Sequence, residues 1–175
     1  MRGPTILATS RFEQVVRNHQ DRVFSYARYA LGSHEEAQDI TQDVFIRLWD
    51  HWAEIDQESV TGWIIRVARN ACFDKLRQRQ TRTALLQEHF HDEEKFQPPD
   101  DAFGDDGGEL RRQIELAIQE LDEPYRTIVI LREIDELAYD QIASALTMPL
   151  NTVKVYLHRA RRMLREKLKG VNESA

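Results

Sequence analysis

An acidic segment punctuated by prolines and glycines, near the middle of the chain, restricts what the chain can fold into. Residues 84–109 hold one lysine against nine aspartates and glutamates, and they include two prolines and three glycines. A segment of this composition buries too little apolar surface to offset the entropy lost when a chain is ordered. We therefore predict two small units, residues 10–83 and 110–170, joined by an acidic flexible linker at 84–109.

Both flanking stretches carry the hydrophobic spacing of helices, with apolar residues three and four apart. Ser10 and Glu13 have the spacing of a capping box, which predicts the start of the first helix. Gly32 predicts its end, and Ser33 with Glu36 predicts the cap of the next helix. No stretch alternates with a period of two for long enough to indicate a sheet. We predict an all-α fold of two small helical domains.

Composition excludes several other classes of protein. The net charge of −6 belongs to the acidic segment, because both flanking units are nearly neutral and each ends in a basic stretch. The apolar runs are far shorter than the ~20 residues that span a bilayer. Residues 1–9 lack the apolar core of a secretory signal, and the single cysteine, Cys72, excludes an internal disulfide. We expect a cytoplasmic protein with no membrane insertion.

Residues 139–169 follow the pattern of a short helix, a tight turn and a basic helix. Ile142 and Leu146 would pack the short helix inward, and Val153 and Leu157 would bury one side of the last helix. Its other side, over 151–169, holds seven lysines and arginines against one glutamate. A solvated basic face on an ordinary bundle helix would carry the same charge. The tight turn before it favours a helix-turn-helix that places the basic helix in a DNA major groove.

The segment IASALTMPLNTVKVYLHRARR resembles the promoter −35-binding segment of bacterial sigma factors, whose usual form is IA…LG(V/I)SxGTVKSRLxRAR. The preceding LDEPYRTIVILREIDELAYDQIA also resembles that family. The likeness implies −35 DNA contacts by Thr152, Lys154, Val155, His158, Arg159, Arg161 and Arg162. Thr147 and Asn151 replace common glycines, and we expect Asn151 to tolerate unusual backbone angles. Val155 and Tyr156 replace a common Ser-Arg pair, so the −35 sequence stays open.

The segment AQDITQDVFIRLW, residues 37–49, resembles AEDLVQEVFLRLW, the polymerase-docking helix of the same family. One apolar stripe runs through Ala37, Ile40, Val44, Leu48 and Trp52, and a second, offset stripe holds Phe45 and Trp49. The residues alone leave open whether both stripes are core. The resemblance implies that a coiled coil of the largest polymerase subunit is bound by Asp39, Gln42, Asp43, Phe45, Ile46 and Trp49.

The segment WIIRVARNACFDKLRQRQTR, residues 63–82, resembles WLyRIARNlalDllRrrrR, the family's −10-recognition helix. Six arginines and lysines oppose only Asp74. The likeness implies −10 DNA contacts by Arg66, Arg69, Asn70, Lys75 and Arg77, with Asn70 reading a base. Residues 54–60 correspond to the loop that captures a flipped base, but here they are acidic and lack the usual aromatic and arginine.

Together these segments identify the chain as a member of the extracytoplasmic-function (ECF) sigma factors. The resemblance implies that it binds core RNA polymerase and both double-stranded and melted promoter DNA. It would then initiate transcription of a stress- or signal-responsive regulon, under the control of an anti-sigma factor or another regulatory protein. We expect no catalytic residues and no cofactor. His89 and His91 lie near acids, but a polar linker explains them better than a metal site.

Three alternatives make different demands on the sequence. A decoy that only titrates an anti-sigma factor has no need of the basic last helix. An ordinary helix-turn-helix regulator has no need of the docking motif at 37–49, and an enzyme needs an active site that we do not find. The acidic linker adds a regulatory hypothesis, in which it competes with DNA phosphates for both basic helices until polymerase binds. Alternatively, its acids only keep the linker soluble and extended.

Overall fold

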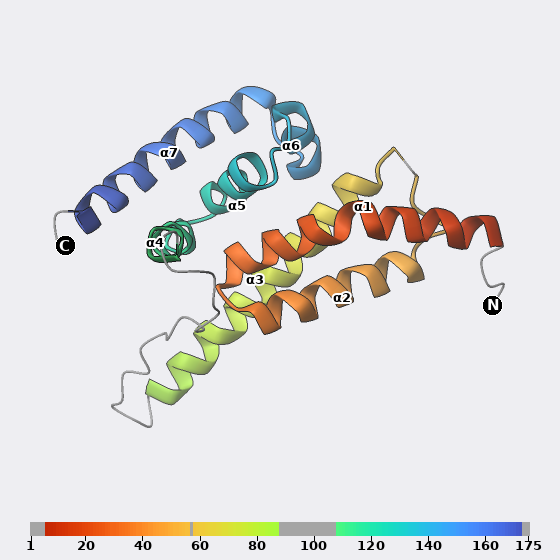
Figure 1. The fold of residues 1–175 in the computed structure, drawn as a ribbon, viewed down its shortest axis with the longest axis horizontal. Helices are drawn as coiled ribbons and strands as arrows, with labels where there is room; N and C mark the ends of the chain where they lie inside the picture. The colour runs from red at the N-terminus through yellow and green to blue at the C-terminus, as the bar shows by residue number, and fades with distance from the viewer. Residues whose placement is uncertain (1–5, 57, 88–107, 173–175) are drawn as a thin grey trace.

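The computed structural model describes residues 6–56, 58–87 and 108–172, and these residues form helices and turns with no strand (Figure 1). The N-terminal unit consists of α1 (Ile6–Leu31), α2 (His34–Asp50) and α3 (Val60–Gln87). The C-terminal unit consists of α4 (Gly108–Gln119), α5 (Tyr125–Val129), the π-helical turn η1 (Ile130–Ile134), α6 (Tyr139–Leu146) and α7 (Leu150–Asn172). The prediction of an all-α fold with two helical units is confirmed.

The turn between α1 and α2 forms as the sequence predicts. Gly32 follows α1 with a φ of 70°, in the left-handed region that glycine adopts without strain. The Ser33 hydroxyl accepts a hydrogen bond from the Glu36 backbone N–H at 3.3 Å and so caps α2. The predicted start of α1 is wrong, because the helix begins at Ile6 and Ser10 lies inside it. The helix-compatible residues before Ser10 extend the helix past the capping signal.

The helix-turn-helix is built from α6, a three-residue turn and α7. Ile142 of α6 and Val153 and Leu157 of α7 are almost fully buried, so the two helices share a core. Thr147 ends α6 with a φ of 54°, which is strained for a β-branched residue and explains why glycine is common there. Asn151 lies within α7, so its tolerance of unusual backbone angles is not called on, and the left-handed conformation falls on Thr147.

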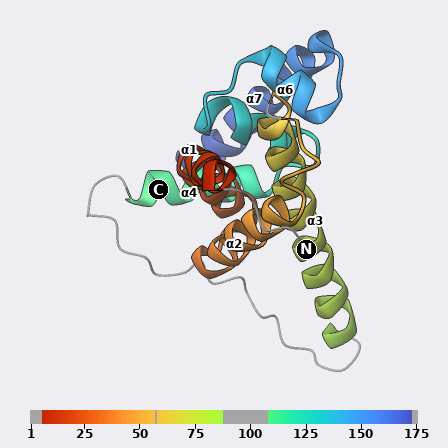
Figure 2. The same cartoon turned by 90° about the vertical axis from the view of Figure 1, so that its right-hand side faces the viewer.

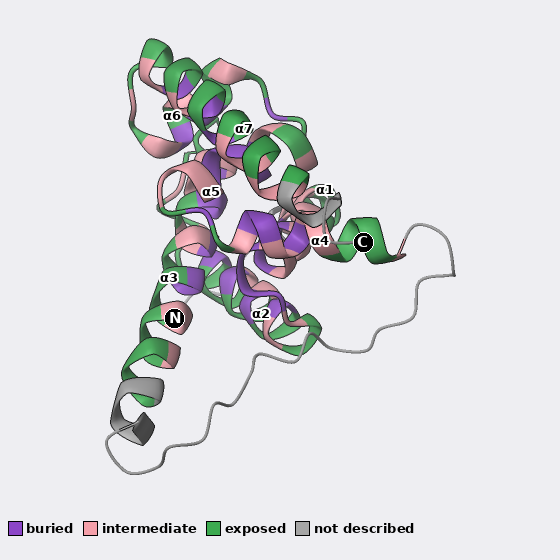
Figure 3. Ribbon diagram, turned by 90° about the vertical axis from the view of Figure 1, so that its left-hand side faces the viewer, coloured by how far each residue is buried: buried purple, intermediate pink, exposed green. Residues whose placement is uncertain are grey.

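The two units pack against each other. Their buried side chains form one continuous cluster, and α1 contacts α4 and η1 while α3 contacts α6. Figures 1 and 2 show α6 and α7 on one side of α1 and α2 on the other. Figure 3 shows buried segments where the two units meet and exposed ones along the distal part of α3 and much of α7. Residues 88–107 of the predicted linker lie outside the described residues, so its role and the domain boundaries stay predictions.

Candidate polymerase and nucleic-acid interfaces

The first candidate surface lies on α2, which has one buried and one exposed side. Ala37, Ile40, Val44 and Leu48 are buried, and α2 packs on α1 and α3. Of the residues predicted to bind polymerase, Phe45 is half-buried. The other five are exposed: Asp39, Gln42, Asp43, Ile46 and Trp49. Ile46 is 59 % exposed and Trp49 is 40 % exposed. The first apolar stripe is therefore core, whereas the second is divided: Phe45 packs partly against the core, and Trp49 is exposed together with Ile46.

Trp49 is supported by an α1 side chain whose role the sequence did not reveal. The Phe12 ring meets Trp49 edge-on with centroids 4.8 Å apart, and it meets Trp52 in the same way at 5.2 Å. Edge-to-face pairs of this kind stabilise and orient both rings. Helical spacing marks Phe12 as a core residue, but its partners are set by tertiary packing. Phe12 thus links α1 to the exposed face of α2.

The second candidate surface is a stripe along α3. Arg66, Asn70, Phe73 and Arg77 follow one another at intervals of three and four residues, and all four are exposed. Phe73 is 36 % exposed, and the Arg69 guanidinium lies 5.1 Å from its ring centroid. An exposed aromatic between cations is typical of surfaces on which unpaired bases stack. The sequence prediction missed Phe73, although its position three residues after Asn70 was a usable signal.

Two other cations of α3 are less available than their charge suggests. Arg69 is half-buried, and its Nε is buried without a hydrogen-bond partner. Arg79 donates to the Leu31 carbonyl oxygen at 2.9 Å and also bonds to the Glu36 carboxylate. Arg79 therefore fastens α3 to the turn between α1 and α2. Lys75, another predicted DNA contact, is also half-buried.

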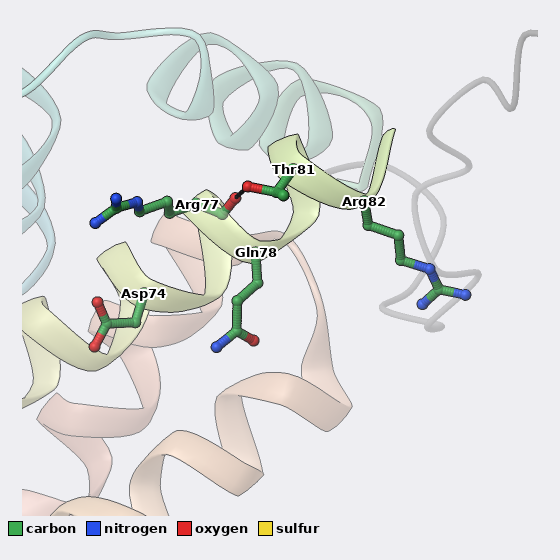
Figure 4. Close-up of a pocket in the computed structure, with 5 residues that line it drawn as sticks. All are labelled: Asp74, Arg77, Gln78, Thr81 and Arg82. Carbon is green, nitrogen blue, oxygen red and sulfur yellow. Dashed lines mark hydrogen bonds between the residues drawn. The ribbon is translucent and has the colours of Figure 1, made fainter. Parts of the chain in front are cut away.

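The distal half of α3 carries an open hollow of about 440 Å³ that contains Arg77. It is lined by Asp74, Arg77, Gln78, Thr81 and Arg82. Figure 4 shows Arg77 and Arg82 extending away from the helix, while the Thr81 hydroxyl donates to the Arg77 carbonyl oxygen at 3.1 Å. Two guanidinium groups against one carboxylate give the hollow a net positive charge. Such a lining suits a nucleic-acid backbone better than an apolar ligand.

The segment between α2 and α3 covers a smaller cavity of about 120 Å³. Its lining is formed by Arg11 and Val15 of α1 together with Trp52, Ile55 and Val60. This is the segment that the sequence likens to a base-capturing loop. Residues 54–60 lack an aromatic and an arginine, but the cavity has both, because α1 supplies Arg11 and Trp52 lies just before residues 54–60 in the segment between α2 and α3.

The third candidate surface is the outer face of α7. The predicted −35 contacts lie on this face. Thr152 is half-buried, and the other six are exposed: Lys154, Val155, His158, Arg159, Arg161 and Arg162. Arg161 donates a hydrogen bond from Nη2 to Glu133 at 2.6 Å, and hydrogen bonding to Glu133 raises the pKa of Arg161. Arg162 lies 3.8 Å from Glu166 in a fully solvated pair that contributes little. The exposed cations on this face thus remain available to phosphates, apart from Arg161, which is tied to η1.

Other kinds of site are not found in the described part of the chain. No group of three or more histidine, cysteine or acidic side chains is arranged to hold a metal ion among the described residues. No described helix is long and apolar enough to cross a membrane. Cys72 is buried, and burial raises the pKa of its thiol to about 12, so it is a core residue without thiolate character.

These faces define a helix-turn-helix protein that carries a second basic helix and an exposed face of apolar and acidic residues on a separate unit. Residues 15–82 match the family described as Sigma-70 region 2, and residues 111–164 match Sigma-70, region 4. The ECF RNA polymerase sigma factor SigW of Bacillus subtilis is 30 % identical over 170 residues, which cover 91 % of this chain and 90 % of SigW. The chain belongs to the ECF sigma factor family.

Further comparisons agree with this assignment. The ECF RNA polymerase sigma factor SigE of Mycolicibacterium smegmatis is 30 % identical over 163 residues, which cover 92 % of this chain but 63 % of SigE. The sigma factor RpoE of Bartonella quintana, solved with the anti-sigma factor NepR, has a TM-score of 0.69 at 21 % identity, covering 91 % of this chain and 97 % of RpoE. CnrH, solved with the cytosolic domain of CnrY, has a TM-score of 0.70 at 19 % identity, covering 93 % and 90 % of the two chains. At these identities the two structures show a shared fold.

Proposed function

We propose that the chain docks on core RNA polymerase through α2, contacts the −10 promoter element through α3 and contacts the −35 element through α7. The observation that carries this proposal is the separation of three exposed faces on one chain. The α2 face combines acids with Ile46 and Trp49, whereas the α3 and α7 faces are basic. A regulator that acted on DNA alone would have no use for the α2 face.

The α2 face has the chemistry of a protein-docking site. Ile46 and Trp49 supply apolar area that would be buried on binding, and large exposed aromatics commonly dominate binding energy. Asp39, Gln42 and Asp43 beside them are exposed and would meet a basic partner such as the polymerase coiled coil. Phe45 completes the patch from a half-buried position.

The two basic helices suit different forms of DNA. The α3 stripe of Arg66, Asn70, Phe73 and Arg77 combines cations with an aromatic face, which fits unpaired −10 bases. The outer face of α7 combines Lys154, which can reach base edges, with cations further along the helix that suit the phosphates of a duplex. We assign Lys75 and Arg69 to supporting contacts, since both are half-buried.

The proposal also covers partners and place of action. The polymerase would carry out RNA synthesis, so this chain would contribute binding energy and no catalytic residue. It would act in the cytoplasm, with the polymerase. We propose an anti-sigma factor or another regulatory protein as a further partner, which the complex of Bartonella quintana RpoE with the anti-sigma factor NepR supports.

The docking assignment is tested first with the double variant Asp43→Arg/Trp49→Ala. We expect roughly a hundredfold loss of affinity for core polymerase, because the variant removes an aromatic anchor and reverses a charge at one interface. Binding of labelled full-length chain to core polymerase measures the loss, and thermal melting monitors the fold.

Two further variants make the result specific. Ile46→Asp changes a side chain that is 59 % exposed, so it should weaken binding without lowering stability. Asp21→Arg reverses an exposed charge on α1 and serves as the control. If the double variant and Ile46→Asp both kept full affinity for core polymerase, the docking site would not be on this face of α2. If Asp21→Arg lost as much affinity for core polymerase, the effect would come from the change in net charge and not from the α2 face.

A further inference from the structure

The basic helix α7 is joined to the turn η1 by one ion pair. Arg161 donates to the Oε1 atom of Glu133 from Nε at 3.0 Å and from Nη2 at 2.6 Å. A guanidinium that is held through two of its N–H groups has a defined orientation, which a single hydrogen bond does not give. The neighbouring Arg162 differs, because it lies 3.8 Å from Glu166 of the same helix. Of these two pairs, only Glu133–Arg161 joins α7 to another element.

The backbone that carries Glu133 is held in place by hydrogen bonds of its own. The Asp135 N–H donates to the Ile130 carbonyl oxygen at 3.0 Å, across the π-helical turn. Arg132 donates from Nη1 to the Leu137 carbonyl oxygen at 2.8 Å and so closes the segment that follows η1. Glu133 is therefore an acceptor on a fixed element of the unit.

Tyr139, the first residue of α6, joins the same cluster. Its side chain hydrogen-bonds to Arg161, and the Arg132 guanidinium lies 4.8 Å from its ring centroid. An exposed ion pair that stands alone contributes little, but a network with shared partners holds its geometry better. Arg161 thus meets both elements that precede α7 in the helix-turn-helix unit, η1 through Glu133 and α6 through Tyr139.

Arg161 lies on a flank of α7 and not on the face opposite its core. At about 100° per residue, it is roughly 40° around the helix from the buried Leu157 and roughly 120° from the exposed Val155. Arg162 is only about 20° from Val155. A recognition helix turns the face opposite its core toward the major groove. A phosphate that took Arg161 would also leave Glu133, which is 40 % exposed, close to the DNA backbone, where like charges repel.

We propose that Arg161 is a positioning residue, which fixes the orientation of α7 through Glu133 and Tyr139 and neutralises no phosphate. This rests on the proposed function and changes the role that the family resemblance implies for Arg161. Hydrogen bonds to base edges depend closely on distance and angle, so Lys154 and Arg159 lose them if α7 can rotate. Phosphate contacts carry no sequence information. Loss of the pair should therefore weaken binding to specific DNA and leave binding to random duplex unchanged.

Removal of the acid gives opposite results under the two roles. Holoenzyme is formed with the full chain, and its affinity is measured for random duplex and for the −35 duplex that the wild type selects from a random pool. If Arg161 positions α7, Glu133→Ala should lose at least about fivefold on the selected duplex, the low end of what one lost base contact costs. If Arg161 bound a phosphate, Glu133→Ala would free it and strengthen binding. Glu166→Ala is the matched control, because it removes one acid from a solvated pair and should gain slightly on both duplexes.

Substitution of the arginine tests the same role through the salt dependence of binding. Arg161→Gln should lose at least about fivefold on the selected duplex at an unchanged salt slope, whereas Arg162→Gln should lower the slope by about one unit. Arg161→Lys keeps the charge without the planar fork, so it should lose as much as Arg161→Gln. The reversed pair Glu133→Arg/Arg161→Glu keeps the net charge and should recover most of the loss. A phosphate ligand predicts the reverse, since Arg161→Lys would be tolerated and the reversed pair would repel DNA.

Three outcomes would overturn the positioning role, namely a gain in Glu133→Ala, a salt slope lowered by about one unit in Arg161→Gln, or an equal loss on random duplex. Each variant is measured well below its melting temperature, so a loss of folded chain does not contribute. If the wild-type holoenzyme selects no duplex, the proposed function fails. The pair is then still tested by thermal unfolding of Glu133→Ala, Arg161→Ala and the double variant. Changes in stability that simply add would show that the pair is not formed.

Discussion

The two basic helices, α3 and α7, have similar charge in the sequence and use it differently in the structure. On α7 the buried residues Val153, Leu157 and Ala160 share one side, and the cations lie on the other. On α3 the cations are distributed around the helix. Arg79 fastens the N-terminal unit together and Arg69 is half-buried, so fewer cations remain for a ligand.

The difference follows from what each helix packs against. α7 packs along one face on the rest of its own unit, whereas α3 contacts α1, α2 and α6. Along its first half α3 therefore presents only a narrow free stripe, and that stripe leads to Phe73 and to the cations of the exposed distal half. Net charge therefore overstates the electrostatic contribution of α3 more than that of α7, where Arg161 and Lys167 pair with Glu133 and Glu120 but Lys154, Arg159 and Arg165 are exposed. We expect α3 to depend on stacking and α7 on charge.

The largest effects that distinguish the helices should come from α7. If Lys154 or Arg159 contacts a base edge, its replacement by alanine should cost about 1–3 kcal/mol and relax specificity at one or two base pairs. Replacement of Arg162, assigned to a phosphate, should weaken all sequences alike and reduce the salt slope by about one unit. Binding to specific and random duplexes over a range of salt concentrations separates the two behaviours. Equal losses on both DNAs for all three variants would refute the base-reading assignment.

The next largest effect should be at Phe73 on α3. Phe73→Leu keeps most of the apolar volume and removes the aromatic face, so it should weaken binding to single-stranded −10 DNA by about 1–2 kcal/mol through lost stacking. Binding of duplex DNA should stay unchanged, and Phe73→Tyr should retain affinity. Holoenzyme binding to a single-stranded −10 oligonucleotide measures the effect. A loss on duplex of the same size would remove the contrast between α3 and α7.

A smaller effect should separate structural from DNA-binding cations within α3. Arg79→Gln breaks the bond to the Leu31 carbonyl and should lower the free energy of unfolding by about 1 kcal/mol, a modest value because Arg79 is 34 % exposed. Arg77→Gln changes an exposed cation two residues away and should weaken DNA binding without affecting stability. Urea unfolding and DNA titration of both variants test the pair. The assignment is wrong if Arg79→Gln loses DNA affinity at unchanged stability.

Local features of this fold could be predicted from the sequence, and contacts between distant residues could not. The Gly32 turn and the Ser33 cap depend on neighbouring residues, and both form as predicted. The two apolar stripes of α2 were visible, but which one faces solvent depends on how α2 packs against α1. Arg79 and Glu36 are 43 residues apart, and Tyr26 and Thr127 are 101 apart. No local pattern indicates such pairs, so the structural role of Arg79 and the contact between the two units went unpredicted.

The smallest predicted effect concerns Val155, where the chain departs from the family's common serine. At 100° per residue Val155 lies nearly opposite the buried side of α7. It is 47 % exposed, with Asn151 one turn before it and His158 and Arg159 one turn after. The thymine methyl is the apolar group of the major groove, so we expect Val155 to contact one thymine of the −35 element. Burying a single methyl contributes about 0.8 kcal/mol, or roughly a fourfold change in affinity.

Deoxyuridine, which is thymine without its methyl, isolates this contact. In the duplex that the holoenzyme binds best, each −35 thymine is replaced in turn and affinity is measured for the wild-type chain, Val155→Ser and Val155→Ile. We expect one position to lose about fourfold with the wild type and with Val155→Ile, and to lose nothing with Val155→Ser, because serine has no methyl to bury there. The same penalty with valine and serine would show that another residue contacts the methyl. No penalty at any position would show that Val155 does not read thymine, even though α7 still binds the −35 element.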